Sequence, residues 1–295
     1  MPADDAALAD LCSFAAIETA SCDLEPWAAV IGELHLGGEL SREEATWLLT
    51  LYNTYDDLGS AWSVFTRWPS PRAWTLDEDR GGAADYPCTQ ERRNLRGGLV
   101  LRRLYGYAQE LSGGPQLPWI EHPLVGDTPE RDFVRLTAHL RRIWGVGRQA
   151  AFEWAEFLGK CVGVPVSAGD AQLWESEGPR RSLQRLYGIP KPTQRELDHI
   201  AADCHARITA SGVELAVWDF ETVICDFNVM RDGRYYPGRH LAALREEIDG
   251  MNGDRPVMDR AWWRVVPEPW AGIAPGISKA QMPVYRDTGR MVDHP

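Results

Sequence analysis

The sequence predicts a mainly α-helical protein whose helices pack in two lobes, followed by an extended C-terminal arm. Apolar residues recur every three or four positions in several segments, which is the spacing of one buried helix face. Two capping boxes, at Ser41–Glu44 and Thr193–Glu196, mark helix starts. From Arg255 onward, prolines recur without a sustained period. We therefore expect a helical domain over residues 1–254, without a strong linker between its lobes, and an arm over residues 255–295 lying on the core.

The first capping box opens a long helix that we expect to run from Ser41 to about Trp62. Its apolar face consists of Leu48, Leu51, Tyr52, Tyr55, Leu58 and Trp62. A second stripe is polar and consists of Asn53, Asp56, Asp57 and Ser60, at a spacing that places neighbours side by side on a helix. This stripe is either a solvated face or the polar wall of a cleft.

The next segments alternate between irregular and helical patterns. Residues 68–82 read as a loop, and residues 91–111 as a helix weakened by Gly97 and Gly98. Thr128-Pro129 starts another helix, with proline at a position that tolerates it. Further along, the Thr193 box leads into a helix with Leu197, Ile200, Ala201, Cys204 and Ile208 inward. The run VWDFETVICDF also suits a strand, but the apolar spacing from Val217 favours a helix.

The segment LTAHLRRIWGVGRQAAFEWAEFLGKC, residues 136–161, predicts two short amphipathic helices joined by a glycine turn. Gly145 and Gly147 stand where a tight turn needs a positive φ or close backbone approach. Amides at this turn and at the start of the second helix are suited to hold a phosphate, assisted by the helix dipole and by Arg148. Contacts of this kind position a DNA duplex without reading its sequence.

Asp170 follows this helical hairpin and precedes a new amphipathic segment, AQLWESEGPRRSLQRLYG, so we expect it to be a helix N-cap. A hairpin followed by an acid resembles the helix-hairpin-helix DNA glycosylase superfamily, in which that acid faces a base flipped out of the duplex. The resemblance covers about 50 residues. The alternative is an ordinary helical hairpin followed by a capping aspartate, a common residue at that position.

Composition and charge limit the possible functions. The content of 44% hydrophobic residues and 13 tryptophans supports a folded core. No run approaches the roughly 18 apolar residues of a membrane helix, and the N-terminus is acidic where a signal peptide is basic, so we expect a cytoplasmic protein. The six cysteines are scattered, and no two of them form a CxxC pair. This spacing argues against a zinc ribbon or an iron–sulfur cluster, and we expect free thiols.

The net charge of −12 argues against indiscriminate binding to nucleic acid, because generic duplex affinity comes from cations that displace counterions. Any DNA affinity must be local. Arginines cluster in three places: Arg92, Arg93, Arg96, Arg102 and Arg103; Arg141, Arg142 and Arg148; Arg180, Arg181 and Arg185. Guanidinium groups match phosphate geometry, but frequent arginine equally reflects a GC-rich genome.

Two further segments, LYNTYDDLGSAW (residues 51–62) and ETVICDFNVMRDGRYYPGRHL (residues 221–241), extend the resemblance. Together with the hairpin they are similar to the phage α-glutamyl/putrescinyl-thymine pyrophosphorylase family, also described as amino acid:DNA transferases. The similarity spans residues 47–241, and the family is thought to share the glycosylase-like fold. It implies a step of thymine hypermodification in phage DNA, which would place the protein in the host cytoplasm.

In the reaction that this resemblance implies, the amine of an amino acid or polyamine attacks a pyrophosphorylated 5-hydroxymethyluracil in DNA, and pyrophosphate leaves. Asp170 is the candidate base for the amine. Arg148, Arg234 and Arg239 are the candidates to stabilise the leaving group. Aromatic side chains suited to hold the flipped base are Trp62, Tyr235 and Tyr236. We expect no cofactor, apart from magnesium that could accompany the pyrophosphate.

Two other functions and two residue roles stay open. Gln149 stands where bifunctional glycosylases carry a lysine that forms a Schiff base, so an abasic-site lyase is not expected. A monofunctional glycosylase is the second interpretation. A catalytically silent DNA-binding module is the third. A Cys225 thiolate that adds to C6 of the uracil ring is a variant of the transferase mechanism, although buried cysteines are usually inert packing residues. Glu221, one turn before Cys225, either lines the same substrate pocket as Cys225 or forms a structural ion pair with an arginine.

Overall fold

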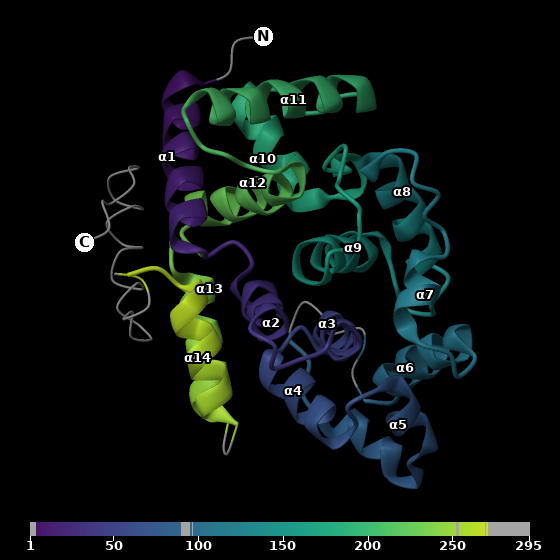
Figure 1. Ribbon diagram of the computed structural model, residues 1–295. Helices are drawn as coiled ribbons and strands as arrows, with labels where there is room; N and C mark the ends of the chain where they lie inside the picture. The colour runs from purple at the N-terminus through teal and green to yellow at the C-terminus, as the bar shows by residue number, and fades with distance from the viewer. Residues whose placement is uncertain (1–3, 90–94, 96, 252–253, 269, 271–295) are drawn as a thin grey trace. The chain divides into compact units, whose positions relative to one another are not determined.

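The computed structural model describes residues 4–89, 95, 97–251, 254–268 and 270 (Figure 1). This part of the chain contains fourteen α-helices, two short 3₁₀ helices and no strand, which confirms the predicted mainly α class. None of the helices described is both long and apolar enough to cross a membrane. The chain divides into two compact units. Unit 1 comprises the residues up to Pro26, Asp170–Glu246 and the described residues from Val265; unit 2 comprises Trp27–Gly169 and Glu247–Arg264.

Unit 2 is built around an aromatic cluster with Tyr107 at its centre. The ring of Tyr107 stacks on Trp47 at 6.3 Å between centroids and meets Trp119 and Trp154 edge-on at 5.6 and 5.4 Å. These rings come from four helices, so the cluster fixes the positions of those helices relative to one another. The helices of unit 2 are α2 (Pro26–Leu36), α3 (Arg42–Tyr55), α4 (Leu58–Arg67), α5 (Pro71–Leu76), α6 (Gly98–Leu111), α7 (Gln116–Glu121), α8 (Pro129–Leu140), α9 (Arg148–Val162) and α14 (Arg255–Val265), with the 3₁₀ helix η1 (Glu78–Asp85).

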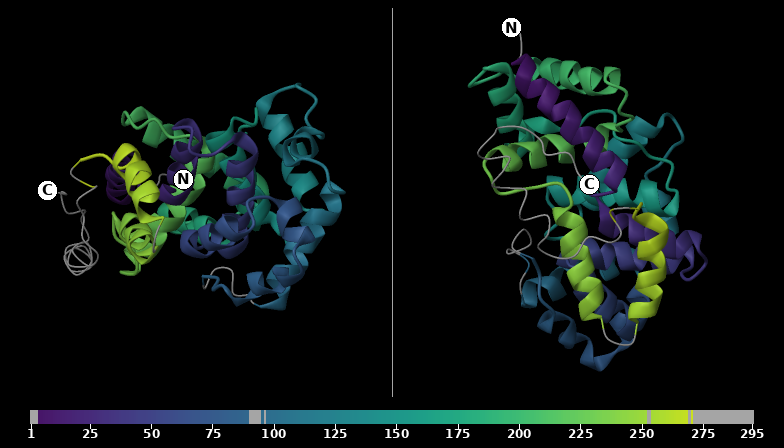
Figure 2. Two further views of the ribbon diagram at one scale, coloured as in Figure 1. Left: turned by 60° about the horizontal axis from the view of Figure 1, so that its bottom comes forward. Right: turned by 90° about the vertical axis from the view of Figure 1, so that its left-hand side faces the viewer.

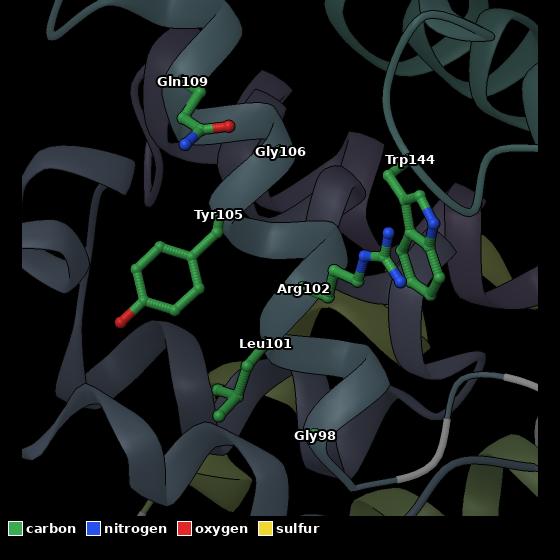
Figure 3. Close-up of a pocket in the computed structure, with 7 residues that line it drawn as sticks. All are labelled: Gly98, Leu101, Arg102, Tyr105, Gly106, Gln109 and Trp144. Atoms are coloured by element: carbon green, nitrogen blue, oxygen red, sulfur yellow. The ribbon is translucent and has the colours of Figure 1, made fainter.

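Gly106 lets the turn after α8 approach α6. A Cβ atom at this glycine would lie 3.5 Å from the backbone nitrogen of Trp144, so the two backbones are in close contact. Figure 3 shows Trp144 beside α6 at this point. The turn that joins α8 and α9 is therefore held against a helix of the same unit.

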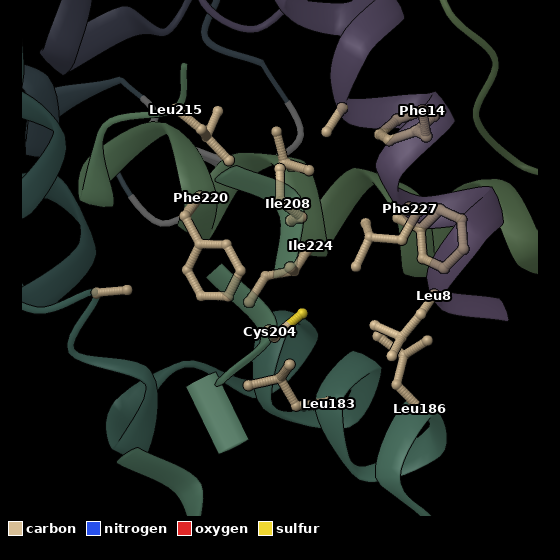
Figure 4. Packing of buried hydrophobic residues seen from close by; sticks show 14 of the residues in the cluster. Leu8, Phe14, Leu183, Leu186, Cys204, Ile208, Leu215, Phe220, Ile224 and Phe227 are labelled. Carbon is tan, nitrogen blue, oxygen red and sulfur yellow. The ribbon is translucent and has the colours of Figure 1, made fainter. Parts of the chain in front are cut away.

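Unit 1 packs α1 (Asp5–Ser21) against α11 (Gln194–Ala210) and α12 (Val217–Arg231) (Figures 1 and 2). The helix α10 (Glu177–Tyr187) lies against α11 and α12 and follows the short η3 (Leu173–Glu175). Figure 4 shows their shared core of buried side chains, among them Leu8, Phe14, Leu183, Leu186, Cys204, Ile208, Leu215, Phe220, Ile224 and Phe227. The helix α13 (Arg239–Gly250) contributes residues to both units.

Local signals in the sequence place several helix starts correctly. Both predicted capping boxes are present, with Ser41 accepting from the Glu44 amide and Thr193 accepting from the Glu196 amide. Thr128 caps α8, with Pro129 in its first turn. The helix from Val217 and the two helices of the 136–161 segment are also confirmed.

Three predicted elements are wrong. The helix expected from Ser41 to Trp62 is broken, because Asp56 adopts a left-handed conformation (φ 57°) and the Asp57 side chain caps a second helix. Residues 68–82 contain α5 and most of η1 rather than a loop. Residues 255–265 form α14 instead of an extended arm, since Pro256 lies in the first turn, where its missing N–H costs nothing. The remainder of the predicted arm lies largely outside the described residues.

Glu43 supports the start of α7 from another helix. Its carboxylate accepts the backbone N–H groups of Gln116 at 3.1 Å and Leu117 at 3.0 Å, and the Gln116 side-chain amide at 3.1 Å. We expect Glu43→Ala to lower the free energy of unfolding by about 1–3 kcal/mol, because these donors lose their acceptor. Urea unfolding followed by circular dichroism measures the change. The matched control is Glu246→Ala, at an exposed position of α13; an equal loss in both variants would refute the capping role.

Candidate functional site

The helical hairpin of unit 2 presents a helix start without a side-chain cap. The chain leaves α8 at Leu140, turns through Gly145 with a φ of 80°, and enters α9 at Arg148. Gly147 is the N-cap of α9, and as a glycine it offers no side chain to accept the first amides of this helix. The Arg148 guanidinium lies 6.0 Å from the Phe152 ring centre. This geometry is compatible with the predicted phosphate contact, which stays a prediction.

Gln149 and Asn53 both make contacts within unit 2. Gln149 is exposed and donates from Nε2 to Glu153 at 2.9 Å. Asn53 is buried; it donates from Nδ2 to the Ala150 carbonyl at 3.1 Å and accepts a hydrogen bond from Arg103 Nη2. Asn53 therefore joins α3 to the first turn of α9, and its amide is neither on a solvated face nor open to a ligand.

The predicted polar stripe does not form, because the helix breaks in its middle. Asp56 ends α3 and accepts a hydrogen bond from the Thr89 hydroxyl. Asp57 begins α4, with Oδ1 accepting the Ser60 amide at 2.6 Å. Both carboxylates are half-buried and engaged locally. Trp62 lies in the core of unit 2 with 7% exposure, so its ring faces are covered in this conformation.

Asp170, in unit 1, is exposed and is not a helix N-cap. Its Oδ1 accepts the backbone N–H of Gln172 at 2.8 Å, in a turn where Gln172 has a φ of 49°. The N-cap residues of the two following helices are Gln172 for η3 and Ser176 for α10. The expectation of a capping aspartate is therefore wrong, because the chain makes a side-chain-stabilised turn before it becomes helical.

Glu221 and Cys225 lie one turn apart on α12 and both face the start of α10. Glu221 Oε1 accepts a hydrogen bond from Ser176 Oγ at 2.8 Å. A Cβ atom at Gly178 would lie only 2.9 Å from the Cys225 sulfur. The glycine therefore allows α10 and α12 to pack closely over this thiol. The sequence places both residues in one pocket wall; the structure brings them together at a helix contact.

The turn between α12 and α13 carries the remaining predicted residues. Arg234 and Arg239 are exposed, and Arg239 donates to the Arg234 carbonyl at 3.2 Å. Tyr235 and Tyr236 are buried, at 1% and 5% exposure. Asp232 accepts from Arg234 at 3.2 Å and from Arg185 at 2.9 Å. Two guanidinium groups, of Arg185 and Arg234, thus contact one carboxylate on the surface of unit 1, and that of Arg239 binds the backbone beside them.

A buried carboxylate, which the sequence analysis did not identify, anchors this turn. Asp23 Oδ1 accepts the Leu241 amide at 2.7 Å, and its Oδ2 accepts the Gly238 amide at 2.7 Å and the Tyr235 hydroxyl at 2.8 Å. Gly238 and Leu241 belong to the start of α13, so Asp23 acts as a helix cap supplied from a distant segment. It holds the backbone from which Arg234 and Arg239 project.

Glu18 lies against Asp23, and the two carboxyl groups share one buried site. Both have no exposed surface. Burial and the negative charge of Asp23 raise the pKa of Glu18 well above its usual value, and burial raises the pKa of Asp23 to about 7. Asp23 accepts three hydrogen bonds, whereas Oε1 of Glu18 has no hydrogen-bond partner among the described residues. Glu18 therefore keeps its proton to a higher pH than Asp23, and Asp23 is the first of the two to become negatively charged as pH rises.

His240 completes this cluster as a neutral side chain. Its Nδ1 lies 2.9 Å from the Asp23 carbonyl, and burial lowers the pKa of His240 to about 4. The local sequence does contain one signal for the cluster: Glu18 continues the stripe of Leu11, Phe14 and Ala15 at helical spacing, so a carboxyl group occupies a core position. The partners of Glu18 are distant in sequence, and no local pattern identifies them.

The predicted site residues thus fall in both units: seven of them, including Asp170, lie in unit 1, and the hairpin and Asn53 lie in unit 2. Within the described residues, no group of three or more His, Cys, Asp or Glu side chains has an arrangement that could hold a metal ion. No disulfide joins any of the six cysteines.

The raised pKa of Glu18 predicts a defined pH dependence of stability. The native state keeps the Glu18 proton at pH values where the unfolded chain has released it, so the native state loses stability as pH rises above about 4.3, the unfolded glutamate pKa. Glu18→Gln removes this titration. We expect the stability of Glu18→Gln relative to the wild type to increase as pH rises from 4 to 8. Asp23, whose pKa is also raised, contributes a trend of the same sign, and His240 contributes the opposite trend below about pH 6.5; both groups are present in both proteins, so the comparison cancels their contributions.

Urea unfolding at a series of pH values measures this difference. Glu214→Gln, at an exposed position of unit 1, is the control and should give a difference that does not change with pH. A constant difference for Glu18→Gln as well would mean that Glu18 does not hold a proton in the native state.

A family model described as amino acid:DNA transferase matches residues 19–234, well over half of the chain. The match includes Asp23, the hairpin, Asp170 and Arg234. A search among curated proteins found no match. The extent of the family match shows that this chain belongs to the amino acid:DNA transferase family.

Proposed function

We propose that the protein transfers the amine of an amino acid or polyamine onto 5-(pyrophosphoryloxymethyl)uracil in phage DNA and releases pyrophosphate. The observation that carries this proposal is the family match over residues 19–234, which implies a transferase acting on DNA with an amino acid as the second substrate. The identity of the modified base, the leaving group and the phage origin go beyond that match.

In this reaction the amine nitrogen forms a bond to the 5-methylene carbon of the uracil. The bond from that carbon to oxygen breaks, and the pyrophosphate leaves with its electron pair. One proton must leave the attacking nitrogen, and the glycosidic bond is untouched. The protein therefore has to position the amine, remove a proton and stabilise the departing negative charge.

Asp170 is the proposed proton acceptor. One carboxylate oxygen, Oδ1, holds the turn through the Gln172 amide, and Oδ2 has no hydrogen-bond partner among the described residues. This division leaves one oxygen to accept a proton while the other fixes the orientation of the side chain. Because Asp170 is exposed, bound DNA would have to exclude water around it.

The arginines around Asp232 are the proposed site of the leaving group. Arg185 and Arg234 share the single Asp232 carboxylate, Arg239 donates to the Arg234 carbonyl, and both Arg234 and Arg239 are exposed. Pyrophosphate gains negative charge as the carbon–oxygen bond breaks, so charge-assisted contacts to guanidinium groups strengthen in the transition state. The hairpin amides and Arg148 are proposed to contact DNA phosphates.

Tyr235, Tyr236 and Trp62 need a change of conformation to serve the flipped base, since all three rings are buried in this structure. We retain Tyr235 and Tyr236, in unit 1, as residues that line the proposed base pocket only in the DNA complex, and Trp62, in unit 2, as a separate candidate contact with a base. Glu221 and Cys225 are retained as parts of the pocket wall, with a thiolate adduct at C6 as an optional step. Magnesium, if needed, would accompany the pyrophosphate.

The products decide between transferase and glycosylase activity. With DNA that contains pyrophosphorylated hydroxymethyluracil and a pool of amines, we expect nucleosides with the mass of the amine adduct, equimolar pyrophosphate and no alkali-labile sites. Mass spectrometry of digested DNA and a coupled pyrophosphate assay provide the readouts. Strand breaks after alkali treatment without pyrophosphate would show that the glycosidic bond is the one cleaved and would reject the proposal.

Replacing Asp170, the proposed general base, tests the mechanism of proton removal. We expect Asp170→Asn to lower the turnover number by about a hundredfold or more, the usual scale for a general base, because the amide keeps the turn but cannot accept the proton. DNA affinity and thermal stability should stay unchanged. Asp198→Asn, at an exposed position of α11 in the same unit, is the matched control. Turnover of Asp170→Asn near that of the wild type would remove Asp170 from the chemistry.

A further inference from the structure

A groove of about 500 Å³ lies on unit 2 between α6 and the turn that precedes α9 (Figure 3). Its floor is one face of α6, where the lining residues recur with the three- and four-residue spacing of a helix. One wall is Trp144, from the turn between α8 and α9. The lining residues are Gly98, Leu101, Arg102, Tyr105, Gly106, Gln109 and Trp144.

Arg102 and Trp144 form a stacked pair at the edge of this groove. The guanidinium carbon of Arg102 lies 4.1 Å from the centre of the indole, and Figure 3 shows the two side chains against each other. Arg102 is exposed, and it has no carboxylate partner within the described part of the chain. The nearby Arg142 differs, because it pairs with Glu110 at 2.9 Å. The groove thus presents a guanidinium group that stacks on an aromatic ring and that no carboxylate of the described residues pairs with.

The opposite side of the groove is also aromatic and held in place. Tyr105 meets Trp74 edge-on at 4.8 Å, and the Arg80 Nε donates to its hydroxyl. Gln109, one turn further along α6, is exposed and supplies an amide with both a donor and an acceptor. A planar ligand with polar edges and a negative charge matches these groups.

We propose that this groove binds an unpaired nucleotide of a DNA strand, with the base stacked on the Arg102–Trp144 pair and its phosphate beside the guanidinium. Stacking on aromatic and arginine planes is the usual way in which proteins bind single-stranded nucleic acid, because every base offers a flat face. The choice of DNA as the polymer rests on the proposed function. The groove adjoins the hairpin turn through Trp144, so the same strand could contact both.

The test uses unmodified DNA, so its result does not depend on the transfer chemistry. Fluorescence anisotropy compares a labelled 12-nucleotide oligo(dT) with a strand of equal length that carries abasic sites in place of bases. We expect the wild type to bind oligo(dT) about tenfold more tightly than the abasic strand, the scale of one stacked base. Trp144→Ala should reduce this preference to nearly one.

Two further variants separate stacking from charge and from misfolding. Arg102→Lys keeps the charge but loses the planar group, so it should lose most of the preference for bases while the salt dependence of binding stays unchanged. Trp263→Ala, at a 57% exposed tryptophan of α14, is the matched control and should bind as the wild type. Circular dichroism checks that each variant is folded. If Trp144→Ala does not fold, the test still stands on Arg102→Lys, which changes an exposed side chain.

Equal affinity of the wild type for the two strands, or an unchanged preference in folded Arg102→Lys, would overturn the proposal. Binding of free thymidine monophosphate as tight as that of oligo(dT) would also overturn it, because the groove would then be a pocket for a free nucleotide. If the base preference is found but no amine transfer is detected on modified DNA, the proposed function fails and this inference stands.

Discussion

The amide groups at helix starts are the constraint on which this structure depends. In a part of the chain built of helices alone, every helix leaves its first amides without an intrahelical acceptor. Serine, threonine and aspartate next to the helix satisfy some of them, as Ser41, Thr128 and Thr193 do. Others receive a carboxylate from far along the chain. These distant caps fix how helices that are remote in sequence meet.

Three carboxylates act in this way. Glu43 supports α7, Asp23 supports α13, and Glu247 accepts the Leu58 amide of α4 at 2.7 Å. Burial and the nearby Asp57 raise the pKa of Glu247 to about 8, and burial raises the pKa of Asp23 to about 7. A carboxylate taken from water is costly unless donors surround it, and helix amides are such donors. In unit 1 this arrangement has a direct link to the proposed chemistry, because the turn that Asp23 anchors is the one carrying Arg234 and Arg239.

The sequence predicts those features whose cause is local. A capping box needs only four residues, so the starts of α3 and α11 were predictable. The break at Asp56 and Asp57 was missed because a continuous apolar stripe masks a side chain that caps the next helix. The prolines after Arg255 were over-interpreted, since Pro256 in a first helical turn is harmless. For the candidate site, the hairpin glycines follow from local pattern, whereas the contacts of Asp23 with residues more than 200 positions away do not.

The pairing of arginines with carboxylates affects how the protein moves along DNA. Many guanidinium groups in the described part of the chain are already neutralised by nearby carboxylates, as at Arg135, Arg142 and Arg207, and the net charge is −12. Few cations then remain to replace the counterions of a phosphate backbone. A protein of this kind does not slide far along a duplex. We expect it to dissociate after each encounter, so that modification of a long DNA proceeds distributively, one site at a time, at a pace set by repeated association.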